Sequence, residues 1–281
     1  MKRRISLPAI PAVLLSIFSV QSGASIAKKL FPVLGASGTC TLRIGLSAII
    51  LAIVNRPSIK GLTRQQWGIC ALYGLFLGSM NIFFYLGISR IPLGLGVTIE
   101  FLGPLTLALA CSRRLKDIIW ALLAGTGIAL IAPWGHDSQV DFIGVLFTLC
   151  AGLCWALYII MGGIVSKRVN NKQAVTFGLF FASLFILPFG IFSGDLAALT
   201  VPYFFMGLGV AIFSSAIPFT LEFIGLKALP AKTFSILMSL HPAVAAMFGF
   251  IFLSEYLTLM QCLSIACVVT ASIGSTLTSK G

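Results

Sequence analysis

The sequence contains very little charge. Only 9% of its 281 residues are charged, whereas an average soluble domain is about 25% charged. Hydrophobic residues make up 58% of the chain, and the mean hydropathy is +1.06. So few polar side chains cannot cover the surface of a water-soluble protein of this length. The composition therefore excludes an ordinary cytosolic globular protein and predicts that most of the chain faces lipid.

The sequence also lacks the common catalytic motifs. We find no HExxH, GxSxG or P-loop motif and no paired His and Asp in the apolar segments. The seven cysteines all lie in apolar segments, and Cys150 and Cys154, four apart on one helix face, are interpreted as packing residues. We expect no catalytic residues, metal or cofactor. An intramembrane enzyme and an uncoupled channel or assembly subunit stay open as alternatives.

Apolar stretches of about 20 residues recur along the whole chain. Each is long enough for a helix rising about 1.5 Å per residue to cross a hydrocarbon core about 30 Å thick. The stretches are apolar all round rather than alternating, which excludes barrel strands. We predict an all-α membrane protein with ten transmembrane helices, over residues 8–27, 36–54, 67–88, 93–112, 117–134, 142–163, 174–193, 202–224, 233–253 and 257–277.

Positive charge is concentrated in alternate connections between these spans. Only Lys28, Lys29 and Arg90 lie in the connections of the opposite side. Because positively charged connections stay in the cytoplasm, both termini are predicted to be cytoplasmic, and the net charge of +12 needs no nucleic-acid partner. The residues that mark the cytoplasmic side are Lys2, Arg3, Arg4, Arg56, Lys60, Arg64, Arg113, Arg114, Lys116, Lys167, Arg168, Lys172, Lys227, Lys232 and Lys280.

The chain contains a weak internal repeat. A shift of 138 positions aligns Gly87 with Gly225, Pro92 with Pro230, Leu102 with Leu240, Pro104 with Pro242, and Asp117 with Glu255. We predict two five-helix repeats, 1–138 and 139–281. Because five is an odd number, the second repeat is inverted relative to the first, as in many secondary transporters. Substrate is then expected near the midplane, between the two halves.

Few ionisable residues lie at membrane depth, where a charge costs roughly 2.5–3.5 kcal/mol or more. Arg43 and Glu100 each lie roughly 12 Å deep, so a salt bridge between them and exposure to a cavity are both open. Glu222 lies nearer the cytoplasmic end and either faces the cavity or extends to the interface. His241, close to mid-membrane, is interpreted either as a proton carrier or as a neutral, hydrogen-bonded imidazole.

Neutral polar and aromatic residues share these depths. Gln21 and Asn81 supply hydrogen-bonding amides in the first and third spans, and Tyr85 follows Asn81 by one helical turn on the same face. Trp155 and Tyr158 lie in the sixth span. We consider these residues candidates for the substrate cavity, with plain helix packing as the alternative.

Several runs of the sequence are characteristic of one transporter family. They are QSGASIAK (21–28) with Leu42-Arg43, MNIFFYLG (80–87), EFLGP (100–104), CWALY (154–158), IPFTLE (217–222), LPAKTF (229–234) and LMS (237–239). These runs resemble those of the threonine/homoserine exporters in the EamA branch of the drug/metabolite transporter superfamily, and the resemblance covers nearly the whole chain. It implies a ten-helix inverted-repeat carrier of the bacterial inner membrane that exports small amino acids and is coupled to proton entry.

One departure from the family pattern affects the expected chemistry. The ninth span carries His241-Pro242 where the resemblance implies Glu-Pro. A group that titrates near neutrality thus replaces a carboxylate. Other EamA-type carriers move S-adenosylmethionine, choline or nucleotide-sugar-like solutes in either direction, so a different cargo and uptake stay open as alternatives.

These observations give a specific hypothesis: alternating access around a midplane cavity. Glu100 or Glu222 accepts the ammonium group of an amino acid and Arg43 binds its carboxylate, while Glu100, Glu222 and His241 are the candidates for proton coupling. The expected partners are the small-molecule substrate, the proton and the lipid bilayer, with no nucleic acid. Both a monomer and a homodimer are open. The remaining candidates for the substrate site are Gln21, Asn81, Tyr85, Trp155 and Tyr158.

Overall fold

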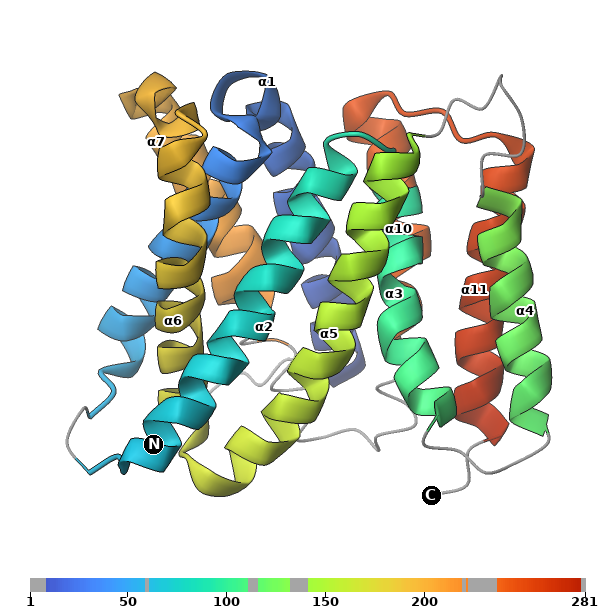
Figure 1. The fold of residues 1–281 in the computed structure, drawn as a ribbon. Coiled ribbons are helices and arrows are strands. Elements are labelled where there is room, and N and C mark those ends of the chain that lie inside the picture. Colours follow the sequence, from blue (N-terminus) through green and yellow to red (C-terminus); the bar gives the residue numbers. More distant parts are fainter. Residues whose placement is uncertain are drawn as a thin grey trace, which may run out of the picture.

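The computed structural model describes residues 9–58, 61–110, 116–131, 141–218, 221 and 237–278, and the regular structure within these ranges is entirely helical (Figure 1). The predicted all-α class is confirmed for this part of the chain. The helices are α1 (Ala9–Asn55), α2 (Arg64–Ile88), α3 (Leu93–Ala110), α4 (Lys116–Ile131), α5 (Phe142–Arg168), α6 (Asn171–Phe192), η1 (Asp195–Ala198), α7 (Val201–Ala211), η2 (Ile212–Ala216), α10 (His241–Leu253) and α11 (Leu259–Thr278).

Helix α1 contains the first two predicted spans and reverses direction at one residue. Gly35 has φ 56° and ψ 173°, a backbone conformation that a residue without Cβ adopts easily. A Cβ at this position would overlap the carboxyl group of Asp195, which accepts a hydrogen bond from the Gly38 amide at 3.3 Å. The first arm is helical up to this turn, so the connection expected over 28–35 was wrong. Lys28 therefore lies in a helix, not in a loop.

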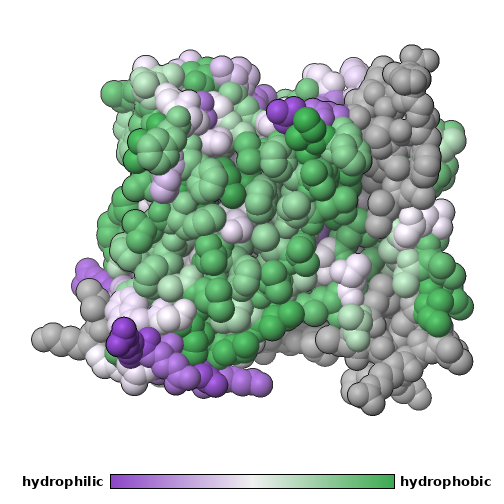
Figure 2. Space-filling model, viewed as in Figure 1, coloured by the Kyte–Doolittle hydropathy of each residue, from purple (hydrophilic) through white to green (hydrophobic). Residues whose placement is uncertain are grey.

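The surface has the hydrophobicity expected of a membrane protein. Figure 2 shows hydrophobic residues over the middle of the visible face and hydrophilic residues toward its two ends. Large apolar side chains such as Phe192, 87% exposed, and Leu259, 72% exposed, point outward. Within the described ranges, four helices are long and apolar enough to cross a membrane: Ala9–Asn55, Arg64–Ile88, Phe142–Val165 and Lys172–Phe192. The other apolar helices are shorter, so the count of ten crossings stays a prediction.

Close backbone contacts between helices occur at glycines, as is common in membrane helices. Gly103 of α3 packs so closely on Gly152 of α5 that a Cβ on Gly103 would overlap the Gly152 carbonyl. A Cβ on Gly74 would lie 2.6 Å from the Gly178 carbonyl oxygen of α6, and Gly78 contacts the same helix. Gly74 and Gly78, four residues apart, thus let α2 pack closely on α6.

The remaining contacts bring segments that are distant in sequence together. Helix α2 packs on α5 and α6, α1 packs on α6 and α7, α3 packs on α5 and α10, and α4 packs on α11. In Figure 1, α4 and α11 stand side by side at one edge of the bundle, and α6 and α7 lie at the opposite edge. This arrangement places α1, α2, α3, α5 and α10 around the middle of the bundle.

Candidate functional site

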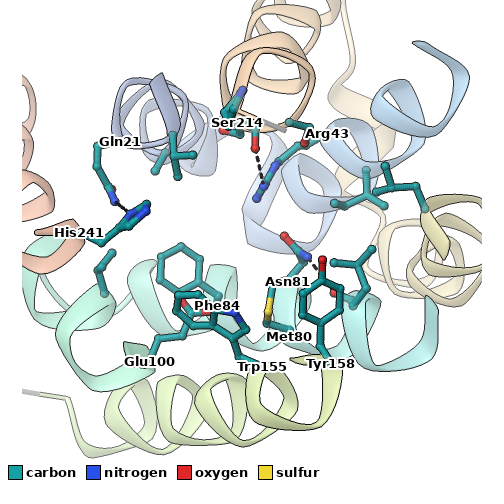
Figure 3. Close-up of a pocket in the computed structure, with 18 of the residues that line it drawn as sticks. Gln21, Arg43, Met80, Asn81, Phe84, Glu100, Trp155, Tyr158, Ser214 and His241 are labelled. Atoms are coloured by element: carbon teal, nitrogen blue, oxygen red, sulfur yellow. Dashed lines mark hydrogen bonds between the residues drawn. The ribbon is translucent and has the colours of Figure 1, made fainter. Parts of the chain in front are cut away.

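A cavity of about 240 Å³ lies where α1, α2, α3, α5, η2 and α10 meet (Figure 3). It is smaller than the roughly 300–1,000 Å³ typical of pockets for drug-sized ligands, which favours a small solute. Most of the lining is apolar. The polar and aromatic residues on the wall are Gln21, Arg43, Asn81, Phe84, Glu100, Trp155, Tyr158, Ser214, Ser215 and His241.

Arg43, on the second arm of α1, is held at the cavity wall by neutral groups. Its Nη1 donates to the Tyr85 hydroxyl at 3.3 Å, and its Nη2 donates to the Ser214 carbonyl at 3.3 Å. The guanidinium carbon also lies 5.4 Å from the centre of the Tyr85 ring, a cation–π distance. Its Nε has no hydrogen-bond partner among the described residues. Arg43 is thus positioned by neutral groups, and it forms no ion pair with a carboxylate of the described residues.

The Ser214 carbonyl is available because the helix is locally distorted. Residues 212–216 form the π-helical turn η2, and π turns are frequent at functional sites because they disturb the regular backbone hydrogen bonding. The Phe213 carbonyl in the same turn accepts a hydrogen bond from Ser19 Oγ at 2.7 Å. The sequence analysis missed Ser214 and Ser215, whose sequence signal was a pair of serines shortly before Pro218 in an apolar span.

Glu100, on α3, lies on the cavity wall and forms no ion pair within the described part of the chain. Its side chain is 7% exposed. The ion pairs within the described part of the chain join other residues, so Arg43 and Glu100 do not form the salt bridge that the sequence left open. The close packing of α3 on α5 next to Glu100 brings Trp155 to the same part of the wall, as Figure 3 shows.

Gln21 and His241 approach each other from helices that lie 220 residues apart. The Gln21 Nε2 and His241 Nδ1 atoms are 3.2 Å apart, in a contact that is fully buried. With the Gln21 amide nitrogen facing the ring, the contact requires His241 Nδ1 to accept, which places the ring proton of a neutral imidazole on Nε2. In the described part of the chain, Gln21 Oε1 and His241 Nε2 have no hydrogen-bond partner.

The other predicted site residues lie in different surroundings. Asn81 lines the cavity and donates to the Leu77 carbonyl of its own helix at 2.8 Å. Tyr158 lines the cavity with its hydroxyl 2.9 Å from that of Tyr73. Tyr85 is fully buried and contacts Arg43 rather than lining the cavity. Glu222 lies outside the described residues.

One ionic cluster was missed by the sequence analysis. Lys28 Nζ lies 2.5 Å from Glu255 Oε1 and 2.7 Å from the Ile91 carbonyl oxygen, and Glu255 Oε2 accepts from the Leu93 amide at 2.7 Å. We call these four residues the Lys28–Glu255 cluster. It joins α1, the start of α3 and the segment after α10. The sequence analysis used Lys28 only for topology and Glu255 only as the repeat partner of Asp117.

Comparison with known proteins identifies the family. The EamA-like transporter family model matches residues 142–277. The threonine/homoserine exporter RhtA of Salmonella typhimurium (strain LT2) is 42% identical over 99% of this chain and 94% of its own, and RhtA of Escherichia coli (strain K12) is 41% identical over the same shares. The chain belongs to the EamA-like transporter family. The resemblance stated from the sequence is therefore confirmed.

More distant relatives agree with this assignment. The uncharacterized transporter YvbV of Bacillus subtilis (strain 168) is 26% identical over 82% of this chain and 79% of its own. A solved crystal structure, described only as that of a protein, matches 95% of this chain and 96% of its own with a TM-score of 0.58 and 17% identity, which shows a shared fold. The EamA-like chain is thus a multi-pass membrane transporter, and its relatives are named for transport rather than catalysis.

Proposed function

We propose that this EamA-like transporter exports small amino acids of the threonine and homoserine type across the bacterial inner membrane in exchange for protons. The names of its RhtA relatives support this cargo and direction, since those proteins are threonine/homoserine exporters. Their similarity extends over 99% of the chain, so it includes every helix that lines the cavity.

The observation that carries the proposal is the charge arrangement of the cavity. One small cavity exposes a guanidinium group and a carboxyl group that are not paired with each other. A zwitterionic amino acid complements both, because Arg43 donates to its carboxylate and Glu100 accepts from its ammonium group. Choline has no carboxylate, so it would leave Arg43 without an anionic partner.

Transport by this site needs alternating access, for which the helix contacts give support. In the proposed inverted repeat, exchange of residues 1–138 with 139–281 converts the α2–α5 contact into α7–α1 and the α3–α5 contact into α10–α1. Both members of each pair occur, and the α4–α11 contact converts into itself. Such symmetry favours two interconverting states of similar packing. In this proposal ten spans cross the membrane with both termini in the cytoplasm.

Proton coupling is assigned to the ionisable groups at membrane depth. Protonation of Glu100 would remove the charge that binds the ammonium group and so release the cargo on the side where protons enter. Glu222 and His241 are the further candidates. A carboxylate in the cavity can bind either a proton or an ammonium group, so competition between the two is a simple physical basis for exchange.

The test uses purified protein in proteoliposomes and counterflow of labelled threonine, with and without a pH gradient. Glu100→Gln is expected to lower the flux about tenfold to hundredfold, as expected for loss of a charge-assisted hydrogen bond, and to weaken the response to the pH gradient. Asp141→Asn, which removes an exposed carboxylate away from the cavity, is the matched control and should transport like the unmodified protein. Unchanged flux and pH response in both Glu100→Gln and Glu222→Gln would refute the proposal.

A further inference from the structure

We infer that Gln21 and His241 together recognise a hydroxyl group on the side chain of the transported amino acid. The inference rests on the proposed function and deepens it, because it names the residues that would distinguish a hydroxylated cargo from an alkyl one. The contacts assigned above to the cargo's carboxylate and ammonium groups use Arg43 and Glu100, so they involve neither Gln21 nor His241.

The pair is a buried and preorganised unit. Gln21 is 1% exposed and His241 is 7% exposed, and both line the cavity. Their mutual hydrogen bond of 3.2 Å uses one polar atom of each side chain and fixes both orientations. His241 is the first residue of α10, and Pro242 follows it within the first turn. The pair therefore presents its remaining polar atoms in a defined geometry.

The two remaining polar atoms are of opposite kind. Gln21 Oε1 is an acceptor, and His241 Nε2 carries the ring proton and is a donor, because Nδ1 already accepts from Gln21. Neither atom has a hydrogen-bond partner in the part of the chain that the structure describes. Buried polar atoms are rarely left unpaired in proteins, so an unpaired donor and acceptor on one buried pair point to a ligand.

A hydroxyl group is the small function that complements both atoms. It donates its proton to Gln21 Oε1 and accepts from His241 Nε2–H with a lone pair. A carboxylate cannot donate to Oε1, an ammonium group cannot accept from Nε2–H, and a methyl group does neither. The pair thus fits the side-chain hydroxyl of an amino acid better than any charged group of its backbone.

The position of the pair in the cavity agrees with this assignment. Figure 3 shows Gln21 and His241 on one side of the cavity, with Arg43 on the other side of the space between them. An amino acid whose carboxylate is bound at Arg43 can therefore direct its side chain toward the pair. The cavity thus separates the groups common to all amino acids from the group that differs among them.

The first measurement compares cargo analogues on the unmodified protein by isothermal titration calorimetry. L-Threonine and L-valine have nearly the same shape, since valine has a methyl group in place of the hydroxyl. L-Homoserine and L-norvaline form a second matched pair. We expect each hydroxylated amino acid to bind at least about tenfold tighter than its partner, because the alkyl analogue leaves buried polar atoms unpaired.

The second measurement repeats both comparisons on Gln21→Leu and His241→Leu. Each substitution is expected to reduce the threonine-to-valine affinity ratio to within about twofold of one, with valine bound as tightly as before or tighter. Retained valine binding also shows that the variant is folded. Gln261→Leu is the matched control, since it changes a buried glutamine that does not line the cavity, and its affinity ratio should stay at the unmodified value.

The outcomes separate this inference from the proposed function. Equal affinity of the unmodified protein for threonine and valine overturns the hydroxyl assignment and leaves amino-acid transport standing; a resident water molecule on the pair would give this result. A preference that persists in both leucine variants overturns the assignment to these residues. Absence of binding of all four amino acids overturns the proposed function, and the inference with it.

Discussion

The cavity and the Lys28–Glu255 cluster show two different surroundings for charge in the same apolar fold. In the cluster, the lysine and the carboxylate lie 2.5 Å apart and use further backbone groups, so each charge is paired. In the cavity, the contacts of Arg43 with the described residues are to neutral oxygens and a ring, and Glu100 has no ion pair within the same part of the chain. Paired charges join helices, whereas unpaired charges are available to a solute.

Among these charged residues, Arg43 should give the largest effect when it is substituted. Arg43→Gln should reduce threonine counterflow to the background of empty vesicles, a loss of roughly a hundredfold, because it removes the proposed donor to the cargo carboxylate. Arg43→Lys should restore only part of the flux, since an ammonium group lacks the planar fork. Arg90→Gln, which removes an arginine away from the cavity, should transport normally, and normal transport by Arg43→Gln would place the cargo carboxylate elsewhere.

The Lys28–Glu255 cluster should respond to mutation as a pair. Lys28→Met leaves a mostly buried carboxylate without its counter-ion, and we expect it to destabilise the fold by about 3 kcal/mol, at the lower end for broken buried pairs. Lys28→Met with Glu255→Gln should be less destabilising than the sum of the single variants. Thermal unfolding in detergent measures both. Additive effects would mean that the two charges are not energetically coupled.

The cavity wall next to Glu100 depends on the close packing of α3 on α5. Adding one methyl group at Gly103 tests this packing. Gly103→Ala should destabilise the protein by about 1–3 kcal/mol, because the added Cβ meets the Gly152 backbone and forces α3 and α5 apart. Gly125→Ala, on α4, is the matched control, because, apart from neighbouring residues of its own helix, no atom of the described residues lies within 4 Å of the added Cβ. Its melting temperature should not fall, and an equal loss in both variants would indicate an effect other than packing.

The exposed Arg90–Asp141 pair should give the smallest effect. Its atoms lie 2.9 Å apart, but the side chains are 45% and 35% exposed, so screening by water leaves little stabilisation. The hydrogen bond from Arg90, aided by the Ile143 amide, holds the pKa of the Asp141 carboxyl below its ordinary value.

A lowered pKa in the folded state means that the stabilisation is present above the ordinary pKa of Asp and is lost as the pH falls through the lowered value. Asp141→Asn should therefore lower the melting temperature by no more than about 2 °C at neutral pH, with a smaller difference in acid below pH 3.8. A drop as large as that of Lys28→Met would contradict the distinction between exposed and buried pairs.

The sequence predicted the helical class and most helix positions because hydropathy is a local property of each segment. The limits of the spans also predicted how deep each residue lies in the membrane, and they placed Arg43 and Glu100 at similar depths. Depth along a helix does not specify rotation about its axis, however, so the presence or absence of a salt bridge between them could not be decided. The Gln21–His241 contact, between the first and ninth predicted spans, was unpredictable for the same reason.

Other errors have local causes. The positive charges at Lys28 and Lys29 suggested a connection, although long lysine side chains can extend to polar groups from within a helix. The helix therefore continues to Gly35. The π turn η2 depends on tertiary contacts of its freed carbonyls with Arg43 and Ser19, which no local sequence pattern encodes. The residues whose roles the sequence did not predict are those that contact partners distant in the sequence.

The turn at Gly35 has a consequence for cargo size. Gln21 lies on the first arm of α1 and Arg43 on the second, so the two proposed contact points for opposite ends of the cargo belong to one folded-back helix. The distance between them is governed by the angle between its arms, which Gly35 and the Asp195 hydrogen bond to Gly38 hold in place. The backbone conformation at Gly35 thus helps to set the distance between the two proposed contact points for the cargo.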